Sequence, residues 1–144
     1  MSNTRNRAIR IFALISLLAI CLTGFTQEVS TSENRYGIEK VNNEKWEVNS
    51  EMMIHIRMME SDIQRTSEDE EIDYDELELK LKDHISDLTS SCTMKGKAHD
   101  ELHKWLIPVI NLVKELSSAE SREEKDVVFQ QIEFSMLEFN KYFR

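Results

Sequence analysis

The chain contains very few residues that interrupt a helix. Only 3 glycines and 1 proline occur among its 144 residues, whereas Leu, Glu and Lys recur throughout. Glycine and proline are the poorest helix formers, and Leu, Lys and Glu are among the better ones. The composition therefore predicts an all-α fold, and the length suits one domain once any targeting segment has been removed.

The first 26 residues have the pattern of a secretory signal. Three arginines precede a continuous apolar stretch, residues 11–25, which ends in small residues. The stretch is shorter than the roughly 20 apolar residues that a membrane span needs. We expect cleavage before Gln27, which gives a periplasmic or secreted protein with no membrane span in the mature chain.

A lipoprotein signal is the minor alternative, with Cys21 as the acylated residue. Ile20 precedes it, where such a signal normally has a small residue. We therefore prefer a cleaved signal peptide at residues 1–26. A polar, unpatterned stretch follows at residues 27–40, which we expect to be a flexible lead-in, and residues 41–144 form the helical domain.

Four stretches repeat apolar residues at the spacing of an amphipathic helix. We expect these helices at about residues 41–65, 73–90, 97–117 and 122–142. The third shows the pattern most fully, with Leu102, Leu106, Val109, Ile110, Val113 and Leu116. Each apolar face needs burial, and short connections place neighbouring helices side by side. The sequence therefore predicts a single up-down antiparallel four-helix bundle.

The charge of the mature chain restricts its partners. Residues 1–26 hold three of the 18 basic residues and none of the 27 acidic ones, so 15 bases remain against 27 acids. Such an acidic protein is repelled by phosphates and by anionic lipids. We expect neither nucleic acid nor an anionic membrane as a partner, and the negative field favours cations.

Two histidines in the third helix have the spacing of metal ligands. His99 and His103 are four residues apart, so both side chains project from the same side of a helix, one turn apart. They are in phase with Leu102 and Leu106, which predicts that they face the interior of the bundle.

Two sulfur ligands precede these histidines in the chain. Cys92 and Met94 are separated by one residue, so an extended connector would point both side chains the same way, and Gly96 could turn them back over His99. Two imidazoles with a thiolate and a thioether suit copper best, because soft sulfur ligands favour Cu(I). We therefore predict a copper site of Cys92, Met94, His99 and His103, with zinc as the second candidate metal, for storage, delivery or tolerance.

The alternative function is a non-enzymatic acidic interaction protein. Cys92 is the only cysteine outside the signal. An exported chain with one unpaired cysteine could form an intermolecular disulfide, or the thiol could be incidental.

The stretch "EMMIHIRMME" in the first helix concentrates methionine and includes His55. Its members cover most of the helix circumference, so we interpret them as core and surface residues, and not as a second copper site.

Two other hypotheses, a zinc peptidase and a haem-binding bundle, fit the sequence poorly. "HDELH" resembles the H-E-x-x-H motif of zinc peptidases, but Asp100 replaces the catalytic Glu and is one methylene shorter. The general architecture resembles a bundle of the cytochrome b562 type, which binds haem through a Met of its first helix and a His of its last. Here the last helix contains no histidine. We therefore expect neither an enzyme nor a haem protein.

Overall fold

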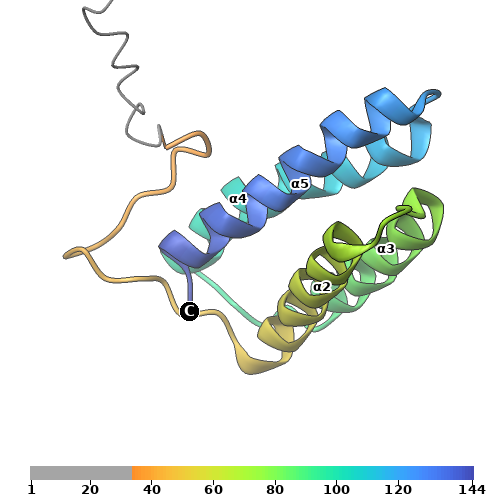
Figure 1. The fold of residues 1–144 in the computed structure, drawn as a ribbon. Helices are drawn as coiled ribbons and strands as arrows, with labels where there is room; N and C mark the ends of the chain where they lie inside the picture. The colour runs from red at the N-terminus through yellow and green to blue at the C-terminus, as the bar shows by residue number, and fades with distance from the viewer. Residues whose placement is uncertain (1–33) are drawn as a thin grey trace, which may run out of the picture. The chain divides into compact units, whose positions relative to one another are not determined.

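The computed structural model describes residues 34–144, which form one unit of four helices (Figure 1). These helices are α2 (Ser50–Glu68), α3 (Tyr74–Ser90), α4 (Lys97–Ser118) and α5 (Arg122–Tyr142). The described residues contain two isolated β-bridges and no strand, so the all-α prediction is confirmed for this part of the chain. The predicted signal peptide, residues 1–26, lies outside the described residues.

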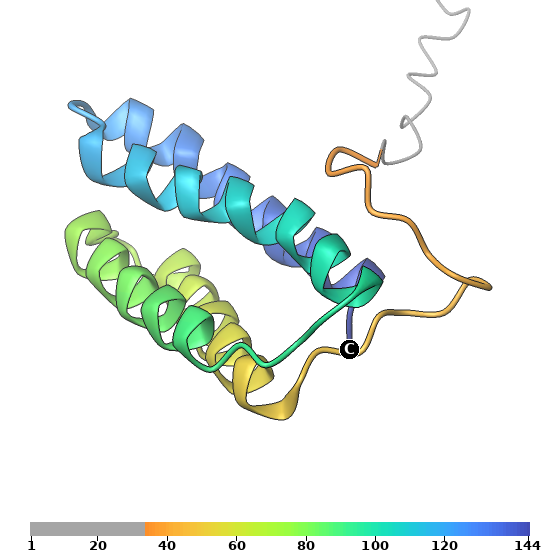
Figure 2. The same cartoon turned by 180° about the vertical axis from the view of Figure 1, so that it is seen from behind.

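The helices pack in two pairs. α2 packs along α3 and α4 packs along α5, as both views of the ribbon show (Figures 1 and 2). α3 also contacts α4, and α2 contacts α5 over a shorter length. This arrangement is consistent with a helical bundle. None of the helices in residues 34–144 has the length and apolar character that a membrane crossing requires.

Side-chain caps fix the starts of three helices. Asn49 accepts a hydrogen bond from the Met52 amide at the start of α2, and Asp73 accepts two amides at the start of α3. Ser121 and Glu124 form a capping box at the start of α5. Such caps satisfy backbone N–H groups that have no partner within the helix. The last three helices begin and end within one residue of their predicted positions.

The first helix begins later than predicted. α2 starts at Ser50, nine residues beyond the expected start at residue 41. Trp46, which we expected inside the helix, instead pairs with the C-terminus: its amide donates to the Tyr142 carbonyl at 2.8 Å, and its carbonyl accepts from the Arg144 amide at 2.9 Å. These bonds require an extended backbone at Trp46. The helix therefore cannot include Trp46, and it begins only after its cap, Asn49.

A single apolar core joins all four helices. Trp105 of α4 is fully buried and donates its indole N–H to the Ser135 carbonyl of α5 at 2.8 Å. Phe139 lies between Trp105 and Phe143, with ring centroids 4.7 and 5.0 Å away. Ile56 and Leu81 extend the core into α2 and α3. The predicted apolar faces therefore meet in one core.

Residues 34–49 form a segment without regular secondary structure, with turns at residues 35–36 and 42–43, which we call the N-terminal strap. Ile38 in this strap is only 1% exposed and belongs to the core. The Glu39 amide donates to Glu101 Oε2 at 2.9 Å, and Lys104 Nζ donates to the Gly37 carbonyl at 2.9 Å. Of the predicted flexible lead-in, residues 27–40, the first seven lie outside the described residues. Near its end, Gly37 and Glu39 bond to α4 and Ile38 between them is buried.

Candidate functional site

The four predicted metal ligands lie where the chain passes from α3 to α4. Cys92 and Met94 belong to the connector, residues 91–96, and His99 and His103 lie in the first two turns of α4. Cys92, Met94 and His99 are half-buried, whereas His103 is exposed. The predicted residues are therefore neighbours along the chain at one end of α4.

The connector is tied to the start of α2. The side-chain amide of Asn49 donates hydrogen bonds to the Ser91 carbonyl at 3.3 Å and to Thr93 Oγ1 at 2.9 Å. The connector ends at Gly96, where φ is 70°, a left-handed conformation that glycine adopts without steric cost. Gly96 precedes α4 and provides no side-chain cap. The glycine at which the chain turns into α4 thus lies three residues before His99.

The two imidazoles lie against each other. Their ring centroids are 4.1 Å apart and their planes are inclined by 48°. His99 Nδ1 lies 3.8 Å from Asp100 Oδ1, so a carboxylate borders the pair. Two imidazoles at this distance on one helix are a common beginning of a metal site, because a single ion can accept a nitrogen from each ring.

The prediction that both histidines face the interior is wrong for His103. The buried side of α4 includes Leu102, Leu106 and Trp105. The predicted apolar face did not include Trp105. Because Trp105 is buried, the centre of the buried side of α4 lies farther from the histidines than predicted. With 3.6 residues per turn, His103 lies about 100° around the helix from Leu102, which places it in solvent. His99 lies nearer the buried side and is half-buried.

The thiol of Cys92 is not grouped with both imidazoles in this conformation. Cys92 and Met94 pack against the hydrophobic core. Within residues 34–144, no three side chains of His, Cys, Asp or Glu are grouped so that they could hold a metal ion. Cys92 is therefore not grouped with His99 and His103, and the described conformation presents a pair of imidazoles without the thiol.

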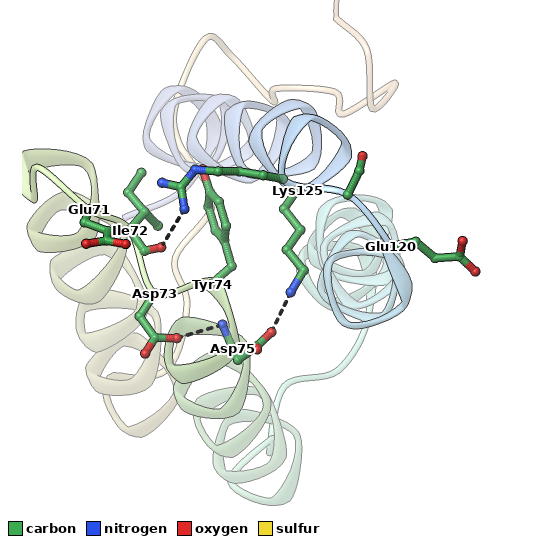
Figure 3. Close-up of a pocket in the computed structure, with 9 residues that line it drawn as sticks. Glu71, Ile72, Asp73, Tyr74, Asp75, Glu120 and Lys125 are labelled. Atoms are coloured by element: carbon green, nitrogen blue, oxygen red, sulfur yellow. Dashed lines mark hydrogen bonds and ion pairs between the residues drawn. The ribbon is translucent and has the colours of Figure 1, made fainter.

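A pocket of about 480 Å³ lies at the end of the molecule where α3 and α5 begin (Figure 3). Lys125 Nζ pairs with Asp75 Oδ1 at 2.6 Å, and the Asp73 carboxylate caps α3. The Arg122 guanidinium donates to the Ile72 carbonyl at 3.5 Å. Lys125 and Asp73 are thus already engaged by the protein, and the Arg122 guanidinium also lies over the Tyr74 ring, 5.6 Å from its centroid. We interpret the pocket as a polar junction between two helix starts.

Tyr74 forms the apolar side of this junction. Its ring packs on Phe129 with centroids 5.6 Å apart, and its hydroxyl donates to Asp126 of α5. Burial and this bond to a carboxylate raise the pKa of Tyr74 to about 12. The phenol is therefore neutral over the physiological range and joins α3 to α5.

Each helix carries one buried carboxylate that pairs with a base on the same helix. The pairs are Asp62 with Arg65, Glu78 with Lys82, Glu101 with Lys104, and Glu138 with Lys141. The sequence pattern does not distinguish these four acids from exposed ones. An acid followed by a base three or four residues later is the available signal, but the same pattern is common on exposed helix surfaces.

A histidine and an aspartate meet between α2 and α3. His84 Nε2 lies 2.8 Å from Asp62 Oδ2, and both side chains are largely buried. His84 lies three residues after Leu81 and four before Leu88, both of which are buried. Asp62 is the partner that explains how a polar ring is accepted on this face of α3. A buried, satisfied hydrogen bond accounts for this pair without a ligand.

No protein-family model, no curated protein and no solved structure matches this chain.

Proposed function

We propose that this protein is an exported, non-enzymatic bundle of up-down antiparallel helices that binds one transition-metal ion, copper, for storage, delivery or tolerance. The observation that carries the proposal is the imidazole pair at the start of α4, with centroids 4.1 Å apart and His103 open to solvent. Short connections between α2 and α3, and between α4 and α5, support the antiparallel order.

The donor types favour copper over zinc. Imidazole nitrogens bind both oxidation states of copper, whereas thiolate and thioether sulfur select Cu(I). Met94 is the discriminating ligand, because zinc makes little use of a thioether. His99 and His103 would bind first, and Cys92 and Met94 would complete the coordination of Cu(I).

Completing the site requires the connector to change conformation. Cys92, which packs against the core, would have to move towards the imidazoles, and the Asn49 side chain holds residues 91 and 93 on either side of it. Gly96 supplies the backbone freedom for this movement. This rearrangement would reduce the net free energy of metal binding. Because the connector would change conformation, the solvent exposure of residues 91–96 should differ between the occupied and the empty protein.

A competition titration with Cu(I) under anaerobic conditions tests the proposal. We expect about one equivalent per chain, with Cys92→Ser and His99→Ala each weakening binding by about tenfold or more, since each removes one of few ligands. Met94→Leu should weaken Cu(I) and leave Zn(II) unchanged. Met58→Leu, at an exposed methionine of α2, is the matched control and should change neither affinity.

The outcomes separate the parts of the site. If Cys92→Ser keeps full Cu(I) affinity while both histidine variants lose it, the site is the imidazole pair alone. If Cys92→Ser, His99→Ala and His103→Ala all bind as the parent does, the metal proposal is wrong.

Export is tested by the N-terminus of the protein purified from its native host. Cleavage before Gln27 would leave a chain without the apolar stretch. An intact Met1 would contradict export by a cleaved signal. A lipid on Cys21 would establish the lipoprotein alternative.

The second candidate function is the acidic interaction protein with an incidental cysteine. The half-buried Cys92, which packs against the core, favours an incidental thiol over an intermolecular disulfide. Mass spectrometry of the non-reduced protein distinguishes these two states. A free Cys92 in a protein that binds no copper would support this second function.

A further inference from the structure

The outer side of α2 carries a shallow apolar groove. It has a volume of about 470 Å³ and is lined by Ser50, Met53, Ile54, Arg57, Met58 and Ser61. Ile54 is 58% exposed and Met58 is 46% exposed. Both are large apolar side chains that gain free energy when they leave water. Two such residues one turn apart on one helix form a continuous apolar strip.

The one base in the groove is already neutralised. Arg57 pairs with Glu60 of the same helix at 2.6 Å and donates to Asn140 of α5 at 2.7 Å. Glu51 is exposed at the other edge of the strip. An exposed acidic run, residues 68–71, continues from the end of α2. The exposed Arg65 lies between the groove and this run, but it pairs with Asp62 of the same helix. The acids near the strip, Glu51 and residues 68–71, therefore outnumber its unpaired bases, in a chain whose formal net charge is −9.

We propose that this groove docks a basic amphipathic helix of a partner protein. The lining runs from Ser50 to Ser61, about 17 Å along the helix at 1.5 Å per residue, which matches three turns of a second helix. Apolar anchors on such a helix would lie on Ile54 and Met58, and its Lys or Arg side chains would meet the acids around the strip. The flexible side chains of Met53 and Met58 can adapt to different anchors.

A second copy of this chain is the competing occupant. The segment begins with SEMM and ends with MMES, so an antiparallel copy would bring like residues together. It would also bring together two chains with a formal net charge of −9 each, and this repulsion opposes a contact of only three turns. Charge complementarity therefore favours a basic partner. The proposal is independent of the copper proposal, because the groove contains none of those four ligands.

The test uses a fluorescent 14-residue peptide of Leu and Lys with Leu at helical spacing, and a matched peptide of Leu and Glu. The full chain should bind the Leu/Lys peptide, and the Leu/Glu peptide should bind at least about tenfold more weakly, as measured by anisotropy. Ile54→Gln combined with Met58→Gln should weaken Leu/Lys binding about tenfold, because loss of about 1.4 kcal/mol of apolar burial is a factor of ten.

Leu79→Gln is the matched control. Leu79 is 61% exposed on α3, outside the groove, so this variant should bind the Leu/Lys peptide as the parent does. All three substituted positions are exposed, so circular dichroism should show parental folding for each variant.

Several results would overturn the proposal. These are no binding of the Leu/Lys peptide, equal binding of the two peptides, parental binding by the Ile54 and Met58 double variant, and an equal loss in Leu79→Gln. Analytical sedimentation distinguishes a partner helix from a second copy of the chain. If the parent is a dimer and the Ile54 and Met58 double variant is a monomer, a second copy occupies the groove.

Discussion

Replacing Ile38 by Ala tests whether the N-terminal strap is part of the fold. Ile38 lies in a segment without regular secondary structure, yet it is only 1% exposed and belongs to the core. The strap is anchored on both sides of it: Lys104 Nζ binds the Gly37 carbonyl and Glu101 Oε2 accepts the Glu39 amide, each at 2.9 Å. The side chain therefore has little freedom to avoid the cavity that its truncation creates.

The expected cost follows from the burial. Truncating a buried Ile to Ala costs about 2–5 kcal/mol, and a surface strap can partly collapse, so we expect about 2–3 kcal/mol for Ile38→Ala. A domain of this size has a free energy of unfolding of about 5–15 kcal/mol. With a urea m-value of about 1.5 kcal/mol/M, the unfolding midpoint should fall by about 1.3–2 M.

Urea unfolding followed by far-ultraviolet circular dichroism measures this effect. Val41→Ala is the control, because Val41 lies in the same strap but is 44% exposed, and its free energy of unfolding should stay within about 0.5 kcal/mol of the parent value. If Ile38→Ala unfolds at the same urea concentration as Val41→Ala, the strap does not contribute to the core. The expectation of a flexible lead-in up to residue 40 would then stand.

Three further predictions concern helices α3 to α5. Leu106→Asp places a carboxylate at a site 4% exposed and should cost about 4 kcal/mol or more in urea unfolding; parental stability would contradict the described packing of α4. Burial acts to raise the pKa of Glu101, but the Glu39 amide and the Lys104 ammonium outweigh it and lower that pKa below its ordinary value. The ionised Glu101 carboxylate therefore stabilises the fold above about pH 4.3, and this stabilisation is lost as the pH falls through the lower folded pKa. In Glu101→Gln the urea midpoint should depend less on pH between about pH 3 and 5 than it does in the parent. Burial and the bond to Asp126 raise the pKa of Tyr74 to about 12. The stability that the neutral phenol contributes is therefore fully present below about pH 10 and is lost as the pH rises towards 12. Tyr74→Phe should reduce this alkaline loss; an unchanged pH dependence would contradict the bond.

Helix positions could be predicted where their determinants are local. α3, α4 and α5 begin beside a cap or a glycine and show regular apolar spacing, and both signals lie within a few residues of each helix end. α2 also begins beside a cap, Asn49, but its apolar spacing continues past this cap to Trp46, so the spacing does not place its start. Trp46 has helical spacing with later apolar residues, but its backbone pairs with Tyr142 and Arg144, almost 100 residues away.

The candidate site was predictable only as a set of residue types. The spacing of His99 and His103 correctly predicts imidazoles side by side, with centroids 4.1 Å apart. Which side of α4 is buried depends on Trp105 and its bond to α5, so the exposure of His103 could not be read from spacing. The packing of Cys92 against the core likewise depends on other helices.

Metal analysis of the protein purified from its native compartment, with no metal added, tests the central claim most directly. The copper proposal predicts about one copper ion per chain in the parent, and little or none in a His99→Ala variant prepared in the same way. A parent protein that contains no transition metal, or that contains zinc without copper, would contradict the claim.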